Sequence, residues 1–241
     1  MPRKKTVIFI QNRAQRYEKI CTYARIFVIL QRFFYRIGQT VAKQPAIIIP
    51  EGCTQVLLHA CCAPCSSAIV EWLLAHHITP VIYYFNPNIY PLEEYEIRKN
   101  ESKRHADSLG IEWIDDDRFK TEEQPCGYGH EAWRETVCGL ENEPERGKRC
   151  EKCFYHRLLA TARKAQELGI QWFATTLASS RWKNLEQINR AGEAAAKEKK
   201  VRFWAQNWRK DGLQERRNQL LKEYRFYNQQ YCGCEFSMRN T

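Results

Sequence analysis

A short apolar segment that runs into three closely spaced cysteines constrains the fold of this chain most. Residues 56–60, VLLHA, have the pattern of a buried β-strand, and residues 66–77 carry apolar side chains at helical spacing. The motif CCAPC stands between them, and its proline suits the first turn of a helix because the missing N–H needs no partner there. The segment therefore predicts a strand, a cysteine-bearing turn and a helix in direct succession.

The same alternation of strand and helix continues along the chain. Gly110 and Gly169 follow two of the predicted helices and mark their C-terminal ends. Regular alternation predicts an α/β fold with a parallel sheet, which binds ligands at the carboxyl ends of its strands. Cys61 and Cys62 lie at such an end. Further strands are predicted at 81–85, 112–114, 171–177 and 201–206, and further helices at 92–109, 150–168, 184–200 and 213–227.

The formal net charge of +10 is concentrated near the two ends of the chain. Residues 1–50 hold ten Lys and Arg against one acid, and residues 193–241 hold eleven against six. A basic total favours a polyanionic partner, and RNA is the natural one in the cytoplasm. Residues 201–210, VRFWAQNWRK, interleave basic and aromatic side chains. This pattern fits phosphate contact with base stacking, or equally a core strand with solvated charges.

The first 46 residues are expected to form a basic extension, and residues 47–241 a single domain. Residues 20–37 predict a basic amphipathic helix, which suits an RNA or membrane surface, or else is a marginal appendage. The chain shows no signal-peptide pattern and no uncharged apolar run near the roughly 20 residues of a membrane helix. We therefore expect a cytoplasmic protein with no membrane partner, in which eleven cysteines serve metal or redox chemistry.

The cysteines fall into three groups and four singles. A helix N-terminus beside CCAPC favours thiolates, which are the metal-binding form. The spacing of CEKC lets both sulfurs reach one metal centre, and the preceding GKR adds positive charge that again favours thiolate. The singles Cys21, Cys53, Cys126 and Cys138 are expected to be buried apolar filler. The groups are CCAPC (Cys61, Cys62, Cys65), CEKC (Cys150, Cys153) and CGC (Cys232, Cys234).

The cysteine spacing leaves more than one metal or redox site open. CC plus CxxC supplies four sulfurs, the number that a [4Fe–4S] cluster and a tetrahedral zinc ion both need. Adjacent side chains are expected to diverge, which favours the larger cluster over zinc. A thioredoxin-like role for CEKC is weakened because the motif does not follow the first strand. CGC closes only a small, strained disulfide suited to redox work, or else supplies metal ligands or free thiols.

Three further residues near predicted strand ends have simpler interpretations. His59 is expected to be a satisfied core residue, or a support for the metal ligands, rather than a ligand itself. Lys183 and Asn184 begin a helix at a strand end, where an anion can dock. The chain contains neither a Walker A motif nor GxGxxG, which argues against the familiar nucleotide cradles.

Five motifs in one order resemble the epoxyqueuosine reductase QueH family. They are LLHACCAPCS, FNPNIYP, GKRCEKCFYHRL, TTLASSRWKN with INRAG, and RKDG leading to QQYCGCEFS, and they span about residues 47–237. The resemblance implies a Rossmann-like (HUP-like) parallel sheet flanked by helices, with a helical C-terminal part. It also implies reductive removal of the epoxide oxygen of epoxyqueuosine at the tRNA wobble position, the last step of queuosine biosynthesis, without cobalamin.

The resemblance also implies a set of site residues. A redox-active disulfide is assigned to Cys232 and Cys234 as the catalytic pair. In some members an additional iron uses the last cysteine of CCAPC, here Cys65. The [4Fe–4S] ligands are assigned to the CC and CxxC pairs, which in this chain are Cys61, Cys62, Cys150 and Cys153.

The implied partners are tRNA that carries epoxyqueuosine and a one-electron donor such as ferredoxin or flavodoxin. Tyr90 and Tyr231 would stack on the presented base, or else are packed core residues. Residues 213–224 depart from the sequence associated with the family, so contact roles there do not carry over. Two alternatives from other classes are a non-catalytic RNA-binding module with a Cys₄ zinc site and a protein thiol–disulfide oxidoreductase.

Overall fold

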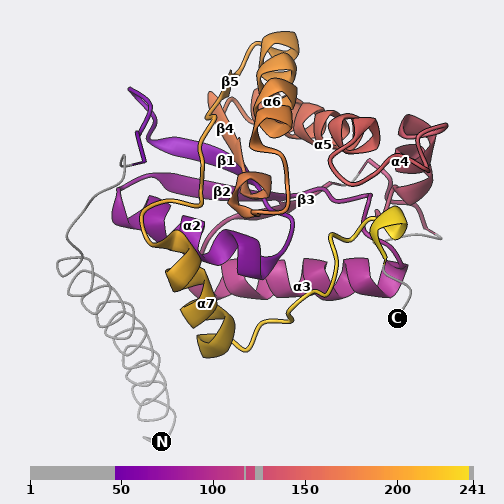
Figure 1. The fold of residues 1–241 in the computed structure, drawn as a ribbon. Coiled ribbons are helices and arrows are strands. Elements are labelled where there is room, and N and C mark those ends of the chain that lie inside the picture. The colour runs from indigo at the N-terminus through magenta and orange to yellow at the C-terminus, as the bar shows by residue number, and fades with distance from the viewer. Residues whose placement is uncertain (1–46, 117, 123–126, 239–241) are drawn as a thin grey trace, which may run out of the picture. The chain divides into compact units, whose positions relative to one another are not determined.

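Five parallel strands in the order β3-β2-β1-β4-β5 form the central sheet (Figure 1). The computed structural model describes residues 47–116, 118–122 and 127–238, within the unit Pro45–Thr241. The predicted basic extension and its helix lie outside the described residues. The parallel sheet confirms the predicted α/β, Rossmann-like class. The strands are β1 Gln55–His59, β2 Thr79–Tyr84, β3 Trp113–Asp115, β4 Trp172–Thr175 and β5 Arg202–Phe203.

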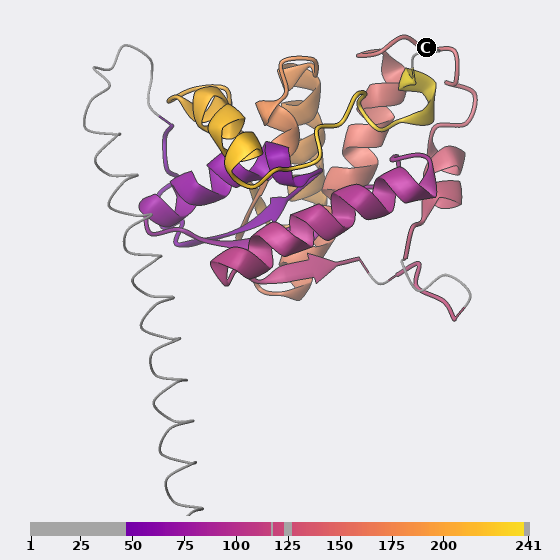
Figure 2. The same ribbon diagram turned by 90° about the horizontal axis from the view of Figure 1, so that it is seen from below.

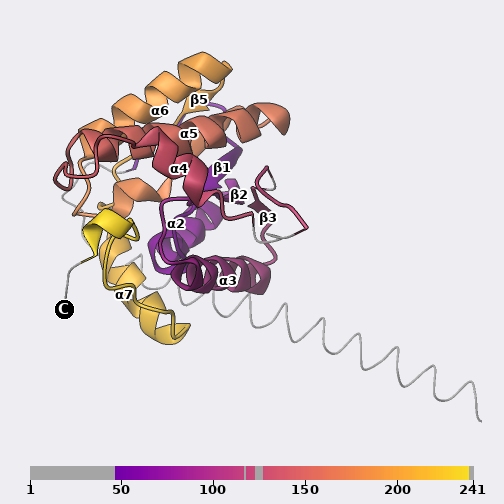
Figure 3. The same cartoon turned by 90° about the vertical axis from the view of Figure 1, so that its right-hand side faces the viewer.

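Helices cover both faces of this sheet (Figure 3). Val56 and Leu58 pack in one core cluster with α2 and α7, whereas Leu57 packs in another with α5 and α6. Successive strand side chains point to opposite faces, so burial on both faces explains the continuous apolar run of β1. The helices are α2 Ala63–Ala75, α3 Leu92–Leu109, α4 His130–Thr136, α5 Lys148–Glu167, α6 Leu185–Lys199 and α7 Leu213–Glu223, with short 3₁₀ turns η1 Thr176–Ser179 and η2 Glu235–Ser237.

The strand order reverses between β1 and β4, which are neighbours in the sheet but distant in sequence. The connections after β1 and after β4 therefore leave the sheet in opposite directions, and the carboxyl ends of these two strands border a crevice. The sequence places CCAPC directly after β1, and η1 directly after β4. The topology alone thus brings the first cysteine group to the edge of the sheet where α/β proteins bind ligands.

Several element ends follow from recognisable local chemistry. α3 has the predicted bounds, and it ends at Gly110, which adopts the left-handed conformation (φ 66°). The side chain of Asn184 caps α6 by accepting hydrogen bonds from the backbone N–H groups of Glu186 (3.0 Å) and Gln187 (3.3 Å). A Cβ at Gly192 would lie 2.4 Å from the Phe203 ring, so α6 approaches β5 closely only because this residue is glycine.

Other elements differ from the sequence-based prediction. α2 begins three residues earlier than predicted, because Pro64 lies within its first turn. α4 was not predicted, and α7 ends at Glu223 rather than at residue 227. The interpretation of residues 201–210 as an RNA-stacking segment is wrong for its two tryptophans, because Trp204 and Trp208 are 4% and 1% exposed and pack against Trp72. The alternative of a core segment is therefore confirmed.

A helix that crosses a membrane must be long and apolar along most of its length. None of the described helices is both long and apolar enough to cross a bilayer.

Candidate metal centre

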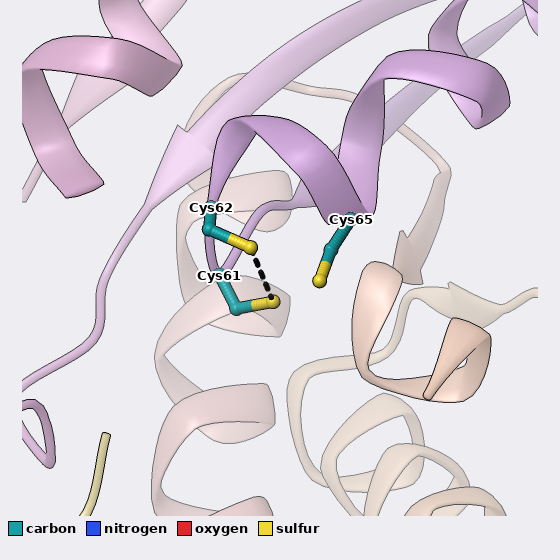
Figure 4. A group of neighbouring side chains, drawn as sticks. All are labelled: Cys61, Cys62 and Cys65. Carbon is teal, nitrogen blue, oxygen red and sulfur yellow. Dashed lines mark hydrogen bonds between the residues drawn. The ribbon is translucent and has the colours of Figure 1, made fainter. Parts of the chain in front are cut away.

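Three buried thiols converge at the turn between β1 and α2. The sulfurs of Cys61, Cys62 and Cys65 all lie within 4.8 Å of one another, and those of Cys61 and Cys62 are 3.8 Å apart. Figure 4 shows the three side chains directed toward one common space, with Cys65 reaching it from the first turn of α2. The expectation that adjacent cysteines diverge is therefore wrong here. We refer to these residues as the three-thiol group.

The spacing within the three-thiol group fits a metal ion. Sulfurs that bind one tetrahedral ion at about 2.3 Å lie about 3.8 Å from each other. Thiolates are soft ligands that select zinc, iron–sulfur clusters and related metal centres. All three residues are at most 8% exposed, so the donors face a largely dry site.

The pKa values of the three thiols differ from one another. Hydrogen bonds from the Cys62 and Cys65 thiols lower the pKa of Cys61 well below its usual value, and Lys183 and Thr176 lower it further. Burial raises the pKa of Cys62 well above its usual value. The same shared hydrogen bonding, led by the contact with Cys61, raises the pKa of Cys65 to about 11. Only Cys61 is therefore shifted toward the thiolate, because a second negative charge beside the first is unfavourable. The causes are neighbouring thiols, Lys183 and Thr176, so the predicted effect of the helix start stays a prediction.

The carboxyl edge of the sheet supports Cys61 through buried polar groups. The Thr176 hydroxyl donates to the Cys61 sulfur at 3.4 Å and accepts from the Cys61 backbone N–H at 3.2 Å. His59 Nε2 lies 3.1 Å from the Phe85 carbonyl and Nδ1 lies 2.8 Å from the Thr175 hydroxyl. Both ring nitrogens therefore have protein partners, which confirms His59 as a satisfied core residue that links three neighbouring strand ends.

A second buried bridge joins the three-thiol group to α5. Arg157 of α5 donates to the Asn86 side-chain oxygen, and the Asn86 amide donates to the Ala60 carbonyl at 2.8 Å. Ala60 immediately precedes Cys61. Arg157 and Asn86 are 2% and 0% exposed. This bridge fixes the start of CCAPC relative to the helix that carries the second cysteine pair.

The second pair, Cys150 and Cys153, occupies the first two turns of α5. Cys150 packs against the core cluster that contains the three-thiol group, but neither cysteine lies within the group's 4.8 Å limit. Burial raises the pKa of Cys150 to about 11 and raises that of Cys153 as well. Arg149 lowers the pKa of Cys150, as predicted from GKR, but burial outweighs this effect. The Arg149 guanidinium itself donates to backbone carbonyls.

Two buried side chains approach the Cys153 sulfur as donors. The Nε1 atom of Trp133 and the Nε atom of Arg157 form no regular hydrogen bond within the described residues, but both side chains interact with the Cys153 sulfur closely enough to lower its pKa. Trp133 and Cys153 belong to one small core cluster, and both Trp133 and Arg157 partly offset the rise in the Cys153 pKa. Buried donors of this kind suit negatively charged sulfur, so the surroundings of Cys153 fit a thiolate that binds metal.

The third cysteine group lies on the C-terminal segment of residues 227–234, which we call the strap. It follows α7 and runs along α3 to η2 (Figure 2). Cys232 is exposed and Cys234 is partly buried, and both are free thiols. Cys234 packs against the cluster of Cys153 and Trp133, and burial raises its pKa to about 12. The strap also reaches the three-thiol group, because the Gln229 amide donates to the Cys65 sulfur at 3.8 Å.

Arg98 of α3 holds the strap in place. Its Nη1 and Nη2 atoms donate to the carbonyls of Cys232 (3.2 Å) and Tyr231 (3.3 Å). Glu94 forms an ion pair with Arg98 at 2.6 Å, and it also accepts from the Tyr227 hydroxyl at 2.7 Å. A Cβ at Gly233 (φ 108°) would lie 2.9 Å from Arg98 Nη1, so the glycine of CGC permits this close contact.

A lysine beside the thiols supplies positive charge. Burial lowers the pKa of the Lys183 ammonium, but electrostatic interaction with the sulfurs of Cys232, Cys61 and Cys65 outweighs burial and raises it. Lys183 therefore interacts electrostatically with both the three-thiol group and the strap. The expectation that Lys183 marks an anion-binding position stays a prediction.

Comparison with known proteins shows the family to which this chain belongs. The model of the family described as epoxyqueuosine reductase QueH matches residues 56–240. The chain belongs to the epoxyqueuosine reductase QueH family. A curated relative with that name from Histophilus somni is 44% identical over 205 residues, which cover 85% of this chain and 80% of the relative. Relatives of the same name from Acinetobacter baylyi and Thermotoga maritima are 43% and 35% identical over 80% and 76% of this chain, and cover 84% and 90% of their own lengths.

Within this QueH-family chain, the structure brings together some predicted site residues and separates others. It gathers Cys61, Cys62 and Cys65, and it packs Cys234 with Cys153 and Cys150 with the core around the three-thiol group. It does not place all four predicted cluster ligands within one short-range group. The predicted disulfide between Cys232 and Cys234, and the four-ligand assignment, stay predictions.

The single cysteines and the predicted stacking tyrosines have mixed outcomes. Cys53 is buried, as expected, but Cys138 is exposed, so the prediction of buried filler is wrong for that residue. Cys21 and Cys126 lie outside the described residues. Tyr90 is 41% exposed, and its carbonyl accepts a hydrogen bond from the Tyr231 hydroxyl. The two tyrosines therefore contact each other at the strap, and their role toward a base stays a prediction.

Sequence reasoning missed three residues that shape the site. Thr176 contacts Cys61, Arg157 anchors Asn86, and Arg98 holds the strap. Thr176 stands within the recognisable TTLASS motif at a strand end, which was a usable signal. The roles of Arg98 and Arg157 depend on residues 134 and 71 positions away in sequence, so no local pattern indicates them.

Proposed function

We propose that this chain reduces the epoxide of epoxyqueuosine in tRNA to the cyclopentene of queuosine, with release of water, at the wobble position and without cobalamin. Family membership supports the reaction and the relatives' names supply the substrate. The observation that carries the proposal is the convergence of Cys61, Cys62 and Cys65 at the switch point of the sheet, beside the strap that bears CGC. The proposed setting is the cytoplasm.

In this proposal Cys61, Cys62, Cys150 and Cys153 hold a [4Fe–4S] cluster. When bound, such a cluster passes single electrons between a donor and the site. Three observations support the ligand set: two of its members lie in the three-thiol group, Cys150 packs against the same core, and two buried N–H donors interact with the Cys153 sulfur. Cys65 is left for an additional iron beside the cluster.

The chain's own residues supply the remaining requirements of the reaction. Removing the epoxide oxygen as water requires two electrons and two protons, and a carbon–carbon double bond forms. The thiols of Cys232 and Cys234 provide both electrons and both protons when they close to a disulfide. A one-electron donor such as ferredoxin or flavodoxin then reopens the disulfide in two steps. The Lys183 ammonium, which interacts electrostatically with Cys61 and Cys232, would stabilise the negative charge that develops on oxygen as the ring opens.

The metal has a second candidate, which is zinc. The 3.8 Å separation of the Cys61 and Cys62 sulfurs fits a single tetrahedral ion as they stand. The alternative of a zinc-bearing RNA-binding module is not favoured, because the chain belongs to the reductase family. Metal analysis and visible absorbance of protein purified without oxygen separate the candidates: a brown protein with about four irons supports the reductase, and a colourless protein with zinc alone supports the module.

The activity is tested by nucleoside analysis of tRNA from a strain that lacks this gene. We expect epoxyqueuosine to accumulate, and a plasmid with the wild-type gene to restore queuosine. A plasmid that encodes Cys61→Ala should fail to restore it, whereas Cys138→Ala, which changes an exposed cysteine away from the groups, should succeed. Normal queuosine in the deletion strain would contradict the proposed substrate.

A further inference from the structure

Trp182 is unusual among the tryptophans of this chain. All seven lie in the described part of the protein, and Trp182 alone appears among its exposed large apolar side chains, at 64% exposure. Trp72, Trp133, Trp204 and Trp208 are at most 6% exposed, and the others pack against the core. A single exposed aromatic ring is not by itself evidence of a site. Its surroundings decide whether the exposure is useful.

Hydrogen bonds hold the backbone around Trp182, whereas its ring is exposed to solvent. Arg146 Nε donates to the Trp182 carbonyl at 2.8 Å, and Arg209 Nη2 donates to the Lys183 carbonyl at 2.9 Å. Arg209 also donates to the Ser180 carbonyl, and the Ser180 hydroxyl accepts from the Trp182 backbone N–H at 3.3 Å. Two arginines from separate parts of the chain therefore fix this loop, so the ring is presented from a rigid support.

The loop lies at the rim of the proposed metal centre. The same Arg146 that holds Trp182 donates its backbone N–H to the Cys150 sulfur at 3.3 Å. Arg146 therefore connects the Trp182 carbonyl to Cys150, which is a proposed cluster ligand. The loop follows directly after η1, whose Thr176 hydroxyl donates to the Cys61 sulfur at 3.4 Å.

The chemistry around the ring suits a nucleic acid more than a protein surface. The Arg181 guanidinium lies 4.9 Å from the centre of the Trp182 ring, so a cation and an aromatic face are offered together. The neighbouring side chains are basic, with Arg146, Lys183 and Arg209 close by. Within the described residues no second large apolar side chain is exposed in this loop, so the apolar area is small for a protein interface but sufficient for one base.

We propose that Trp182 is a stacking platform for an anticodon-loop base next to the modified nucleoside, with Arg181 contacting the adjoining phosphate. This inference rests on the proposed function, because the RNA is the tRNA substrate. The ring holds the neighbouring nucleotide at the rim, and the modified base then extends from it toward the thiols. The platform contributes to binding and orientation of the RNA and takes no part in the electron transfer.

The test uses the full-length, iron-loaded protein and tRNA that carries epoxyqueuosine, isolated from the deletion strain. Trp182→Ala should raise the KM for tRNA about tenfold to hundredfold, in line with the loss of one stacked base, and should affect KM more than kcat. Trp182→Phe keeps an aromatic face and should stay within about threefold of wild type. Leu168→Ala removes another exposed apolar side chain at the far end of α5 and should leave the KM unchanged.

Intrinsic fluorescence gives a second readout that does not depend on turnover. Iodide should quench wild-type emission, and saturating tRNA should protect it, because Trp182 is the exposed tryptophan. Trp182→Phe should show neither the quenching nor the protection. The same measurement with an unmodified transcript of that tRNA should also show protection, since the platform contacts a neighbouring base rather than the modified one.

The outcomes separate this inference from the proposed reaction. Turnover by wild type with an unchanged KM in Trp182→Ala overturns the platform and leaves the reductase intact. Protection of Trp182 by tRNA in a protein without turnover supports the platform and removes the reductase. If Trp182→Ala binds tRNA normally, and loses turnover with a flavodoxin donor but not with dithionite, the ring contacts the donor protein and the inference is wrong.

Discussion

The three-thiol group and the strap both carry cysteines for one proposed reaction, yet the chain builds them in opposite ways. Cys61, Cys62 and Cys65 are buried at the end of a central strand, and the sheet and α2 fix their backbone. Cys232 is exposed on a segment outside the sheet, which is held by Arg98, by a backbone bridge between Ile89 and Cys234 and by side-chain hydrogen bonds of the strap. A metal site needs fixed donor positions, whereas a thiol pair that exchanges electrons with substrate and donor needs access.

The two regions also differ in acidity. Shared hydrogen bonds lower the pKa of Cys61, and burial raises the pKa of Cys234 to about 12. Within the three-thiol group only Cys61 is shifted toward the thiolate, because the pKa values of Cys62 and Cys65 are raised, while Cys234 keeps its proton until a reaction removes it. This contrast agrees with a binding role for the first region and a proton-bearing redox role for the second.

The largest expected effect is the loss of iron in Cys61→Ala, and this variant is the most severe test of the difference between the three-thiol group and the strap. We expect this variant to lose nearly all bound iron and all epoxide reduction, because its thiolate is the acidic member of the group. Iron analysis and visible absorbance of anaerobically purified protein check this result. Cys138→Ala is the matched control, with an exposed cysteine that should leave both measurements at wild-type values. Full iron content in Cys61→Ala would remove the three-thiol group from the ligand set.

The second test concerns the strap alone. Cys232→Ser should keep wild-type iron content, because the exposed Cys232 is not among the proposed ligands, but it should lose multiple turnover. Single-turnover and multiple-turnover assays, together with iron analysis, distinguish the two regions. Iron loss in Cys232→Ser would show that the strap contributes to the metal site, and normal multiple turnover would remove its redox role.

A third test examines the support of the three-thiol group. Thr176→Val removes the hydroxyl that donates to Cys61 at 3.4 Å, so the pKa of Cys61 should rise. Iron affinity should fall about tenfold to hundredfold, the usual cost of losing a group that orients a metal ligand. Protons compete with iron for the thiolate, so the pH of half-maximal iron loading should move upward. Thr176→Ser keeps the hydroxyl and should behave as wild type in an iron titration at several pH values.

The sequence predicted those structural features that depend on residues close together in the chain, and it missed those that depend on residues far apart. The sequence predicted α3 to the residue, because its apolar spacing and Gly110 are local signals, and it predicted the parallel sheet from the alternation of elements. It missed α4 in the polar segment before residue 148, where no apolar periodicity is present. It also left the environment of Trp204 and Trp208 open, because a mixed basic and aromatic segment does not show what packs against it.

The candidate site was predictable in its components more than in its geometry. The cysteine motifs indicated metal and redox chemistry, and the strand end placed Cys61 and Cys62 at the correct edge of the sheet. The close approach of Cys65 and the acidity of Cys61 depend on side-chain packing and on Thr176, which is 115 residues from Cys61. Arg98 lies 134 residues from Cys232, so only the folded chain brings this clamp to the strap.

The smallest expected effect concerns this clamp. Arg98→Lys keeps the positive charge but cannot donate hydrogen bonds to the carbonyls of Tyr231 and Cys232 from two fixed nitrogens at once. We expect unchanged iron content, faster alkylation of Cys232 by iodoacetamide and a severalfold lower turnover number. Lys103→Met, which alters an exposed ion pair on the same helix, is the control and should leave all three unchanged. Iron loss in Arg98→Lys would mean that strap and three-thiol group are not separable.

The buried bridge from Arg157 through Asn86 to Ala60 has a consequence for the maturation of the proposed metal centre. Protein groups already fix the start of CCAPC relative to α5, so we predict that the polypeptide folds without metal, unlike small zinc domains that need metal to fold. Insertion of the proposed cluster would then be a late step in maturation, and metal-free protein should be a competent recipient for reconstitution.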